Sequence, residues 1–154
     1  MSEILKQKIR DIVERVAQAM NITCQVEVGE ELRDGKIRLL AVVRVPDHAH
    51  LLIGKNGQNL QALEHLVRTS VAKESPAVSV TIDINDYKRA KASQVLEIAR
   101  QAVAKVRSTR RAQALAPMSS YERRVVHMEL ASMPDIITES IGQDPQRRIV
   151  VKPL

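Results

Sequence analysis

The sequence is poor in cysteine and in long apolar runs, and each shortage excludes a class of protein. Cys24 is the single cysteine among 154 residues, so neither an internal disulfide nor a cysteine-based zinc site is available. A reducing compartment, the cytoplasm, is therefore expected. Seven charged side chains interrupt the first 20 residues, which excludes a signal peptide or a membrane span there. We expect no membrane insertion.

Aromatic residues are also scarce. The chain has no Trp and no Phe, and its tyrosines are Tyr87 and Tyr121. Modules such as the RRM and many OB-folds bind unpaired bases by stacking them on aromatic side chains. The composition therefore argues against a binding mechanism that depends on a broad aromatic platform.

Positive charge is abundant but unevenly distributed. The net charge is +6, which suits a polyanionic partner. Residues 1–85 contain 11 Lys or Arg and 11 Asp or Glu, residues 86–116 contain 8 and 2, and residues 117–154 contain 5 and 5. The surplus thus lies in the middle segment, where it indicates either a binding surface or a solvated linker.

Hydrophobic periodicity predicts six elements in the first 85 residues, with Asp34-Gly35 as a hairpin turn. In chain order they are a helix over 3–20, strands over 23–29 and 37–45, a short helix over 48–53, a helix from the following loop to about 73, and a strand over 78–84. The fold class is α+β, and residues 1–85 form the first predicted domain.

The rest of the chain is predicted to contain a long helix and a second small domain. Residues 86–113 lack Gly and Pro, which favours one helix within a basic linker over 86–116. Four of its arginines share one face: Arg89, Arg100, Arg107 and Arg111. In the domain over 117–154, a Ser119/Glu122 capping box opens a helix to about 132, and strands over 136–141 and 147–152 follow.

The first candidate site is the loop Gly54-Lys55-Asn56-Gly57 between two predicted helices. Two glycines let a backbone turn sharply and approach a ligand without Cβ atoms, and Lys55 adds a positive charge beside the exposed amides. Such a short pattern is also common as a plain turn between helices. Its surroundings, residues 51–60 with a helix and two strands before and a helix and strand after, resemble a KH domain of the bacterial, type II topology (α-β-β-α-α-β).

The KH resemblance implies a specific binding mode. In that family the loop clamps the backbone of about four nucleotides while the bases lie in an apolar groove. For this chain it implies phosphate contacts at Gly54, Lys55, Asn56 and Gly57, and a groove wall that includes Ile53 and Leu60.

The second candidate site is the pair Arg123 and His127, which are four residues apart and so share a helical face. This stretch, with Arg147 and Arg148 further on, resembles the R-x-x-x-H domain, a small fold that binds single-stranded nucleic acid. The whole arrangement is similar to the Jag/KhpB family of bacterial RNA-binding proteins. Two departures are the missing N-terminal Jag module and Gln146, which stands where an aromatic residue often precedes the paired arginines.

The resemblance implies a single-stranded RNA-binding protein, a post-transcriptional regulator or RNA chaperone, with single-stranded DNA as a further ligand. It also implies a small single-KH protein partner or a homodimer. The alternatives are a nuclease that uses His127, or His48 and His50, and a protein-interaction adaptor. No cofactor, metal site or catalytic residue is expected, and His48 and His50 are not expected to share a face of their short helix.

Overall fold

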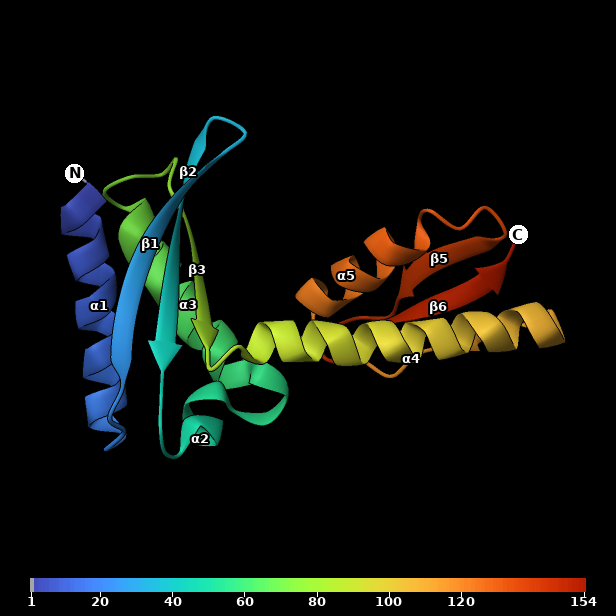
Figure 1. Cartoon of the computed structure of the whole chain (residues 1–154), viewed down its shortest axis with the longest axis horizontal. Coiled ribbons are helices and arrows are strands. Elements are labelled where there is room, and N and C mark those ends of the chain that lie inside the picture. Colours follow the sequence, from blue (N-terminus) through green and yellow to red (C-terminus); the bar gives the residue numbers. More distant parts are fainter. Residues whose placement is uncertain (1) are drawn as a thin grey trace. The chain divides into compact units, whose positions relative to one another are not determined.

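A computed structural model describes residues 2–154, which form two compact units that meet in sequence between Tyr87 and Lys88 (Figure 1). Unit 1 comprises residues up to Tyr87, and unit 2 comprises Lys88–Leu154. Each unit has one three-stranded sheet with helices packed on it. The chain is therefore a mixed α+β protein, as the periodicity predicted. Over residues 2–154, the structure has no helix of the length and apolarity that a bilayer span requires.

Unit 1 contains the six predicted elements in the predicted order, with one 3-10 turn between the last two helices. They are α1 (Ser2–Ala19), β1 (Gln25–Arg33), β2 (Lys36–Arg44), α2 (Ala49–Ile53), the turn η1 (Lys55–Gly57), α3 (Gln58–Ala72) and β3 (Ser79–Ile84). The sheet order is β1-β2-β3, with β1 and β2 antiparallel and β2 and β3 parallel.

The core of unit 1 lies on one face of this sheet. Val28, Ala41 and Ile82 are aligned across the three strands and are all buried. Alternation along each strand places every second side chain on that face, where α1 and α3 pack against it. Both helices bury one apolar stripe, for example Ile9 in α1 and Val67 in α3. This packing fixes the position of α3, and therefore of the loop that precedes it.

Two side chains of α3 also bond to the backbone of β3. Glu64 accepts a hydrogen bond from the Ile82 amide at 2.8 Å, and Arg68 donates one to the Val80 carbonyl at 2.8 Å. Glu64 and Arg68 are themselves paired at 2.7 Å. Backbone groups at a sheet edge otherwise remain open to another strand, so this pair occupies that part of the β3 edge.

Unit 2 is built around α4 (Tyr87–Thr109), whose first residue belongs to unit 1. The other elements are β4 (Gln113–Ala114), α5 (Ser120–Leu130), β5 (Ile136–Ile141) and β6 (Arg148–Pro153), and the antiparallel sheet has the order β4-β6-β5. The predicted capping box is present: Ser119 accepts from the Glu122 amide, and Glu122 accepts from the Ser119 amide.

The long helix is part of the second unit's core. Val95, Ala99, Val103 and Val106 of α4 are buried in one cluster with residues of α5, β5 and β6. The sequence had suggested a basic linker over 86–116. The structure instead uses the apolar stripe of this helix to cover the second sheet, because β5 and β6 alone have no other layer that could complete their core.

Candidate nucleic-acid interface

The G-x-x-G loop, Gly54–Gly57, has a backbone that only its sequence permits. Gly54, Asn56 and Gly57 have φ angles of 76°, 52° and 76°, a region that Gly and Asn adopt more readily than other residues. Lys55 and Asn56 are exposed. The loop therefore presents a lysine, an amide side chain and a tightly turned backbone to solvent.

Neighbouring side chains hold both glycines closely. A Cβ on Gly54 would lie 2.6 Å from Asn59 Cγ and 2.8 Å from the Asn59 amide nitrogen, and Asn59 donates to the Leu51 carbonyl at 2.8 Å. A Cβ on Gly57 would lie 2.9 Å from Cε1 of Tyr87. Both distances are shorter than carbon contacts allow, so the loop is braced by Asn59 on one side and by Tyr87 on the other.

The two expected groove residues differ in exposure. Ile53 is half-buried at the end of α2, whereas Leu60 is only 2% exposed and belongs to the core of unit 1. The prediction that Leu60 forms a groove wall is therefore not supported by its position. Its side chain packs beneath the loop because it lies on the same stripe of α3 as the core residue Leu63.

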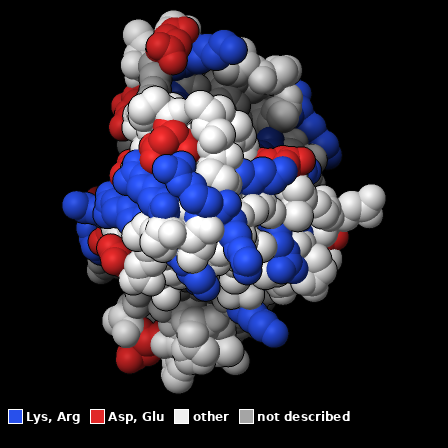
Figure 2. Space-filling model, turned by 90° about the vertical axis from the view of Figure 1, so that its right-hand side faces the viewer, with Lys and Arg blue, Asp and Glu red and all other residues white. Residues whose placement is uncertain are grey.

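Charge separates the two units more sharply than the sequence segments suggested. Unit 1 contains 11 Lys or Arg and 12 Asp or Glu, and unit 2 contains 13 and 6. The net charges are therefore −1 and +7. Figure 2, in which unit 2 faces the viewer, shows Lys and Arg side chains spread over much of that face.

The predicted basic face of α4 is partly engaged inside unit 2. Arg100 pairs with Glu129 at 2.9 Å, and Arg107 makes two hydrogen bonds to Asp135, at 2.7 and 2.9 Å. These bonds raise the pKa of Arg107 and hold the pKa of the Asp135 carboxyl below its ordinary value. Arg89 and Arg111 are exposed and make no ion pair among residues 2–154.

Arg123, the arginine of the R-x-x-x-H motif, points into unit 2. It is 7% exposed, and its Nη1 donates to the Met118 carbonyl at 2.6 Å and to Asp144 at 3.1 Å. The Met118 amide in turn donates to the Arg147 carbonyl at 3.1 Å. Arg123 therefore ties the start of α5 to the turn between β5 and β6, rather than offering its guanidinium to solvent.

The other motif residues remain at the surface. His127 is exposed, and its Nδ1 lies 2.7 Å from the Thr138 hydroxyl, which leaves Nε2 for a ligand. Arg147 is exposed and donates from Nε to the Ser140 hydroxyl at 3.0 Å. Arg148 is half-buried and donates to the Gln146 carbonyl at 3.3 Å.

The structure also exposes residues that the motif comparison left aside. Tyr121 is 45% exposed in the first turn of α5, and the Lys88 Nζ lies 6.0 Å from the centroid of its ring. Arg124 is exposed one turn further on. Because Arg123 is buried, its neighbour Arg124 is the arginine of this helix that reaches solvent; a helical wheel that included the core stripe could have found it.

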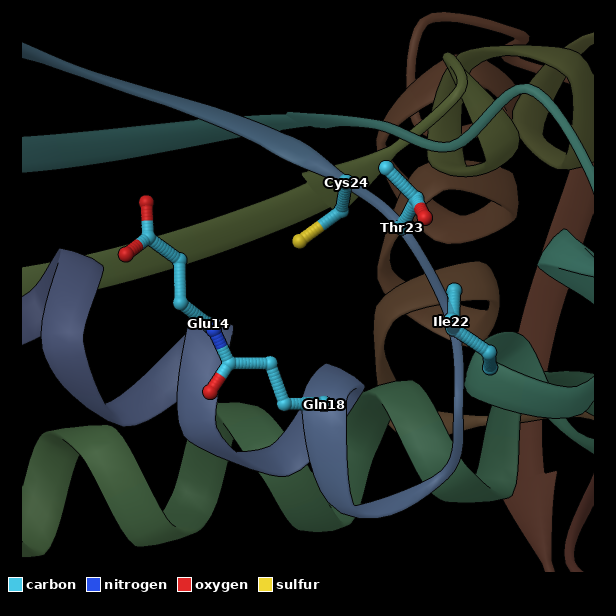
Figure 3. A pocket seen from close by; sticks show the side chains of 5 residues that line it. All are labelled: Glu14, Gln18, Ile22, Thr23 and Cys24. Carbon is cyan, nitrogen blue, oxygen red and sulfur yellow. The ribbon is translucent and has the colours of Figure 1, made fainter.

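Elsewhere, a hollow of about 200 Å³ between α1 and the start of β1 contains the single cysteine. Figure 3 shows the Cys24 thiol and the Glu14 carboxylate projecting into this space. Burial and the nearby Glu14 raise the pKa of the thiol, which keeps it protonated and weakly nucleophilic. The hollow is therefore not a reactive-cysteine site.

The histidines near the loop differ from the sequence-based expectation. His48 and His50 have ring centroids 6.1 Å apart in an edge-to-face arrangement, although two residues of one helix should point apart. The reason is that His48 precedes α2 and has a left-handed φ of 63°, so helical spacing does not apply to it. Across residues 2–154, no group of three or more His, Cys, Asp or Glu side chains is arranged to hold a metal ion.

Comparison with known proteins matches this architecture. A family model for the R-x-x-x-H domain matches residues 93–153, a range that begins in α4 and so includes the helix in the same module as α5, β5 and β6. This chain is 32% identical over 152 residues to the RNA-binding protein KhpB of Clostridium symbiosum, with 97% of this chain and 66% of that protein covered.

Other proteins of that name show the same pattern. The RNA-binding protein KhpB of Bacillus subtilis (strain 168) is 27% identical over 148 residues, with 94% of this chain and 69% of that protein covered. The one from Lactiplantibacillus plantarum is 35% identical over 102 residues, with coverage of 66% and 32%. This chain thus spans between 32% and 69% of the length of these relatives.

Unit 2 therefore contains an R-x-x-x-H domain. With a relative that matches nearly its whole length, the chain belongs to the KhpB (Jag) family.

Proposed function

We propose that this chain is a non-catalytic, cytoplasmic binder of single-stranded RNA, a post-transcriptional regulator or RNA chaperone, that holds one strand through both units. Unit 1 acts as a type II KH domain whose G-x-x-G loop orients the phosphate backbone. Unit 2 supplies most of the electrostatic attraction. The observation that carries the proposal is the loop itself, braced on both sides and open only at Lys55 and Asn56.

Three features of unit 1 support the KH assignment. The element order is helix, strand, strand, helix, helix, strand, and the sheet contains a parallel pair, β2 and β3. The loop lies between α2 and α3, where a KH domain binds its ligand. Its turned backbone leaves room for a phosphodiester because neither glycine carries a Cβ.

The net charge of +7 on unit 2 supports its part of the proposal. A single strand releases condensed counterions when cations replace them at its phosphates, and this release contributes affinity that depends on salt. Exposed cations without an internal partner are best placed for this role. Arg89, Arg110, Arg111 and Arg124 meet that description among the described residues.

An anisotropy titration with a labelled, unstructured RNA of roughly 12 nucleotides tests the proposal. The test variant combines Lys55→Asp with Asn56→Asp, which changes the charge of the loop by −3 and needs no new backbone conformation. Asp tolerates the φ of 52° at position 56. We expect about 10- to 100-fold weaker binding, as for the loss of one charge-assisted contact of about 1.5–3 kcal/mol.

A matched control carries the same change of charge elsewhere on unit 1. Lys36→Asp with Gln25→Glu alters two exposed residues of β1 and β2, and we expect less than a threefold effect from it. Equal losses in the test and control variants would overturn the loop assignment. Cleavage of the RNA by the wild type that disappears in His127→Ala would replace the binder with a nuclease.

A further inference from the structure

The outward face of α5 is the surface of unit 2 that combines an aromatic ring with unpaired positive charge. Burial separates two sides of this helix: Val126 and Leu130 face the core, whereas Tyr121, Arg124 and Met128 are exposed. The exposed residues are three and four positions apart, so they form one continuous strip. The strip is therefore a surface and not a set of isolated side chains.

Negative charge is absent from this strip. The two carboxylates of α5 are Glu122 and Glu129. Glu122 is buried in the capping box, and Glu129 pairs with Arg100 of α4. A phosphodiester that approaches Tyr121 and Arg124 therefore meets no carboxylate of α5 that lacks an internal partner.

One side of the Tyr121 ring already has a cation. The Lys88 Nζ lies 6.0 Å from the ring centroid, within the range in which an ammonium group is attracted to an aromatic face. The tyrosine nevertheless remains 45% exposed. A buried tyrosine of the core would have neither property, and the chain has no Trp or Phe that could serve instead.

We propose that Tyr121 stacks on one unpaired nucleobase of the bound strand, with Lys88 beside its ring and Arg124 at the adjacent phosphate. The inference rests on the proposed RNA binding of unit 2 and adds a base contact to what is otherwise attraction to the backbone. Stacking on an aromatic side chain is tolerant of sequence, because every base has a π-face. Tyr121 thus replaces the aromatic residue that is missing at Gln146.

The test compares two strands that differ in a single base. One is an unstructured RNA, and the other carries abasic sites at successive positions, so that its phosphates are unchanged. On the intact strand, Tyr121→Leu should bind about tenfold more weakly than the wild type, and Tyr121→Phe should bind within twofold of it. On the strand whose stacked base is absent, the wild type and Tyr121→Leu should bind equally.

Intrinsic fluorescence gives a second readout. In a Tyr87→Phe variant, Tyr121 is the sole tyrosine in a chain without Trp, so the emission reports on that ring alone. Stacking should quench this emission when the intact RNA is added. The abasic strand should quench it less at equal saturation.

Ile137→Ala is the matched control. Ile137 is also 45% exposed, but it follows the core residue Ile136 in β5 and so lies on the other face of the sheet. It should leave the affinity unchanged.

The outcomes are distinct. If the wild type fails to bind single-stranded RNA, the proposed function and this inference fall together. If the wild type binds and Tyr121→Leu matches it, only the stacking contact is wrong. Equal losses on the intact and abasic strands would also overturn it, because the ring would then act without a base.

Discussion

Unit 1 and unit 2 differ in how each is equipped to hold an anionic strand. Unit 1 has a specialised backbone, the loop braced by Asn59 and Tyr87, but a net charge of −1. Unit 2 has a net charge of +7 and an R-x-x-x-H domain. Geometry and attraction are therefore built into different parts of the chain, and a substitution should affect one without the other.

The same comparison applies to individual arginines of unit 2. Arg100, Arg107 and Arg123 make ion pairs or hydrogen bonds within the unit, whereas Arg110 and Arg111 are exposed and make no ion pair among residues 2–154. Arginines that share a helix in the sequence can thus differ in role. Those with internal partners stabilise the fold, and those without are available to a ligand.

The largest expected effect is on the stability of unit 2. Arg123→Met removes two hydrogen bonds from a buried guanidinium and leaves the Met118 carbonyl without that donor. We expect a loss of about 2–3 kcal/mol, as for other hydrogen bonds to charged groups. Amide hydrogen exchange at Ile149 and Val151, in the core strand β6, measures it without assuming that both units unfold together.

Arg124→Met is the control for this change. It removes the same side chain from the exposed neighbour and should alter stability by less than about 0.5 kcal/mol. If the two variants exchange at the same rate, Arg123 is not the residue that ties α5 to the turn at Asp144.

The next effect concerns the exposed arginines after α4. Arg110→Gln with Arg111→Gln should weaken RNA binding about tenfold at low salt, since two phosphate contacts are removed. Arg100→Gln with Arg107→Gln makes the same change in charge at residues that already have partners. Anisotropy titrations should show a smaller loss for this second pair, and a larger one would reverse the assigned roles.

A smaller effect is expected from the brace of the loop. Tyr87→Leu removes the ring that lies against Gly57 and should weaken RNA binding about fivefold, roughly 1 kcal/mol, whereas Tyr87→Phe should match the wild type. In the Lys55→Asp, Asn56→Asp background, Tyr87→Leu should cause no further loss. Full additivity in this double-mutant cycle would show that Tyr87 acts independently of the loop.

The smallest expected effect depends on pH. Because Arg107 lowers the pKa of Asp135 below its ordinary 3.8, this pair stabilises the folded chain above that pH, and the contribution disappears as the pH falls through the folded-state pKa. Both groups are exposed, so the effect is modest. The melting temperature of the wild type should exceed that of Asp135→Asn at pH 7, and the difference should shrink at pH 3. A constant difference would exclude the ion pair as its cause.

Local patterns in the sequence predicted the elements well. Period-two alternation predicted the strand over 136–141 at its observed bounds, and the helix predicted over 3–20 is present over 2–19. The capping box was also predicted correctly. These features depend on neighbouring residues, so the sequence contains all the information that they need.

Features that depend on distant residues were not predictable in this way. The short strand β4 forms by pairing with β6, and β1 extends to Arg33 because β2 pairs with it throughout. The burial of Arg123 requires Asp144, which is 21 residues away. The family motif identified Arg123 as a site residue, but only the packing of unit 2 shows that its guanidinium is occupied.

The salt dependence of RNA affinity tests the separation of geometry and attraction most directly. Single-strand binding changes by about 0.7 in log–log slope for each phosphate neutralised, so four contacts give a slope near −3. Lys55→Asp with Asn56→Asp should weaken binding and change the slope by no more than about 0.7, whereas Arg110→Gln with Arg111→Gln should flatten it by about 1.4. A loop variant that flattens the slope more than the unit 2 variant would contradict the account.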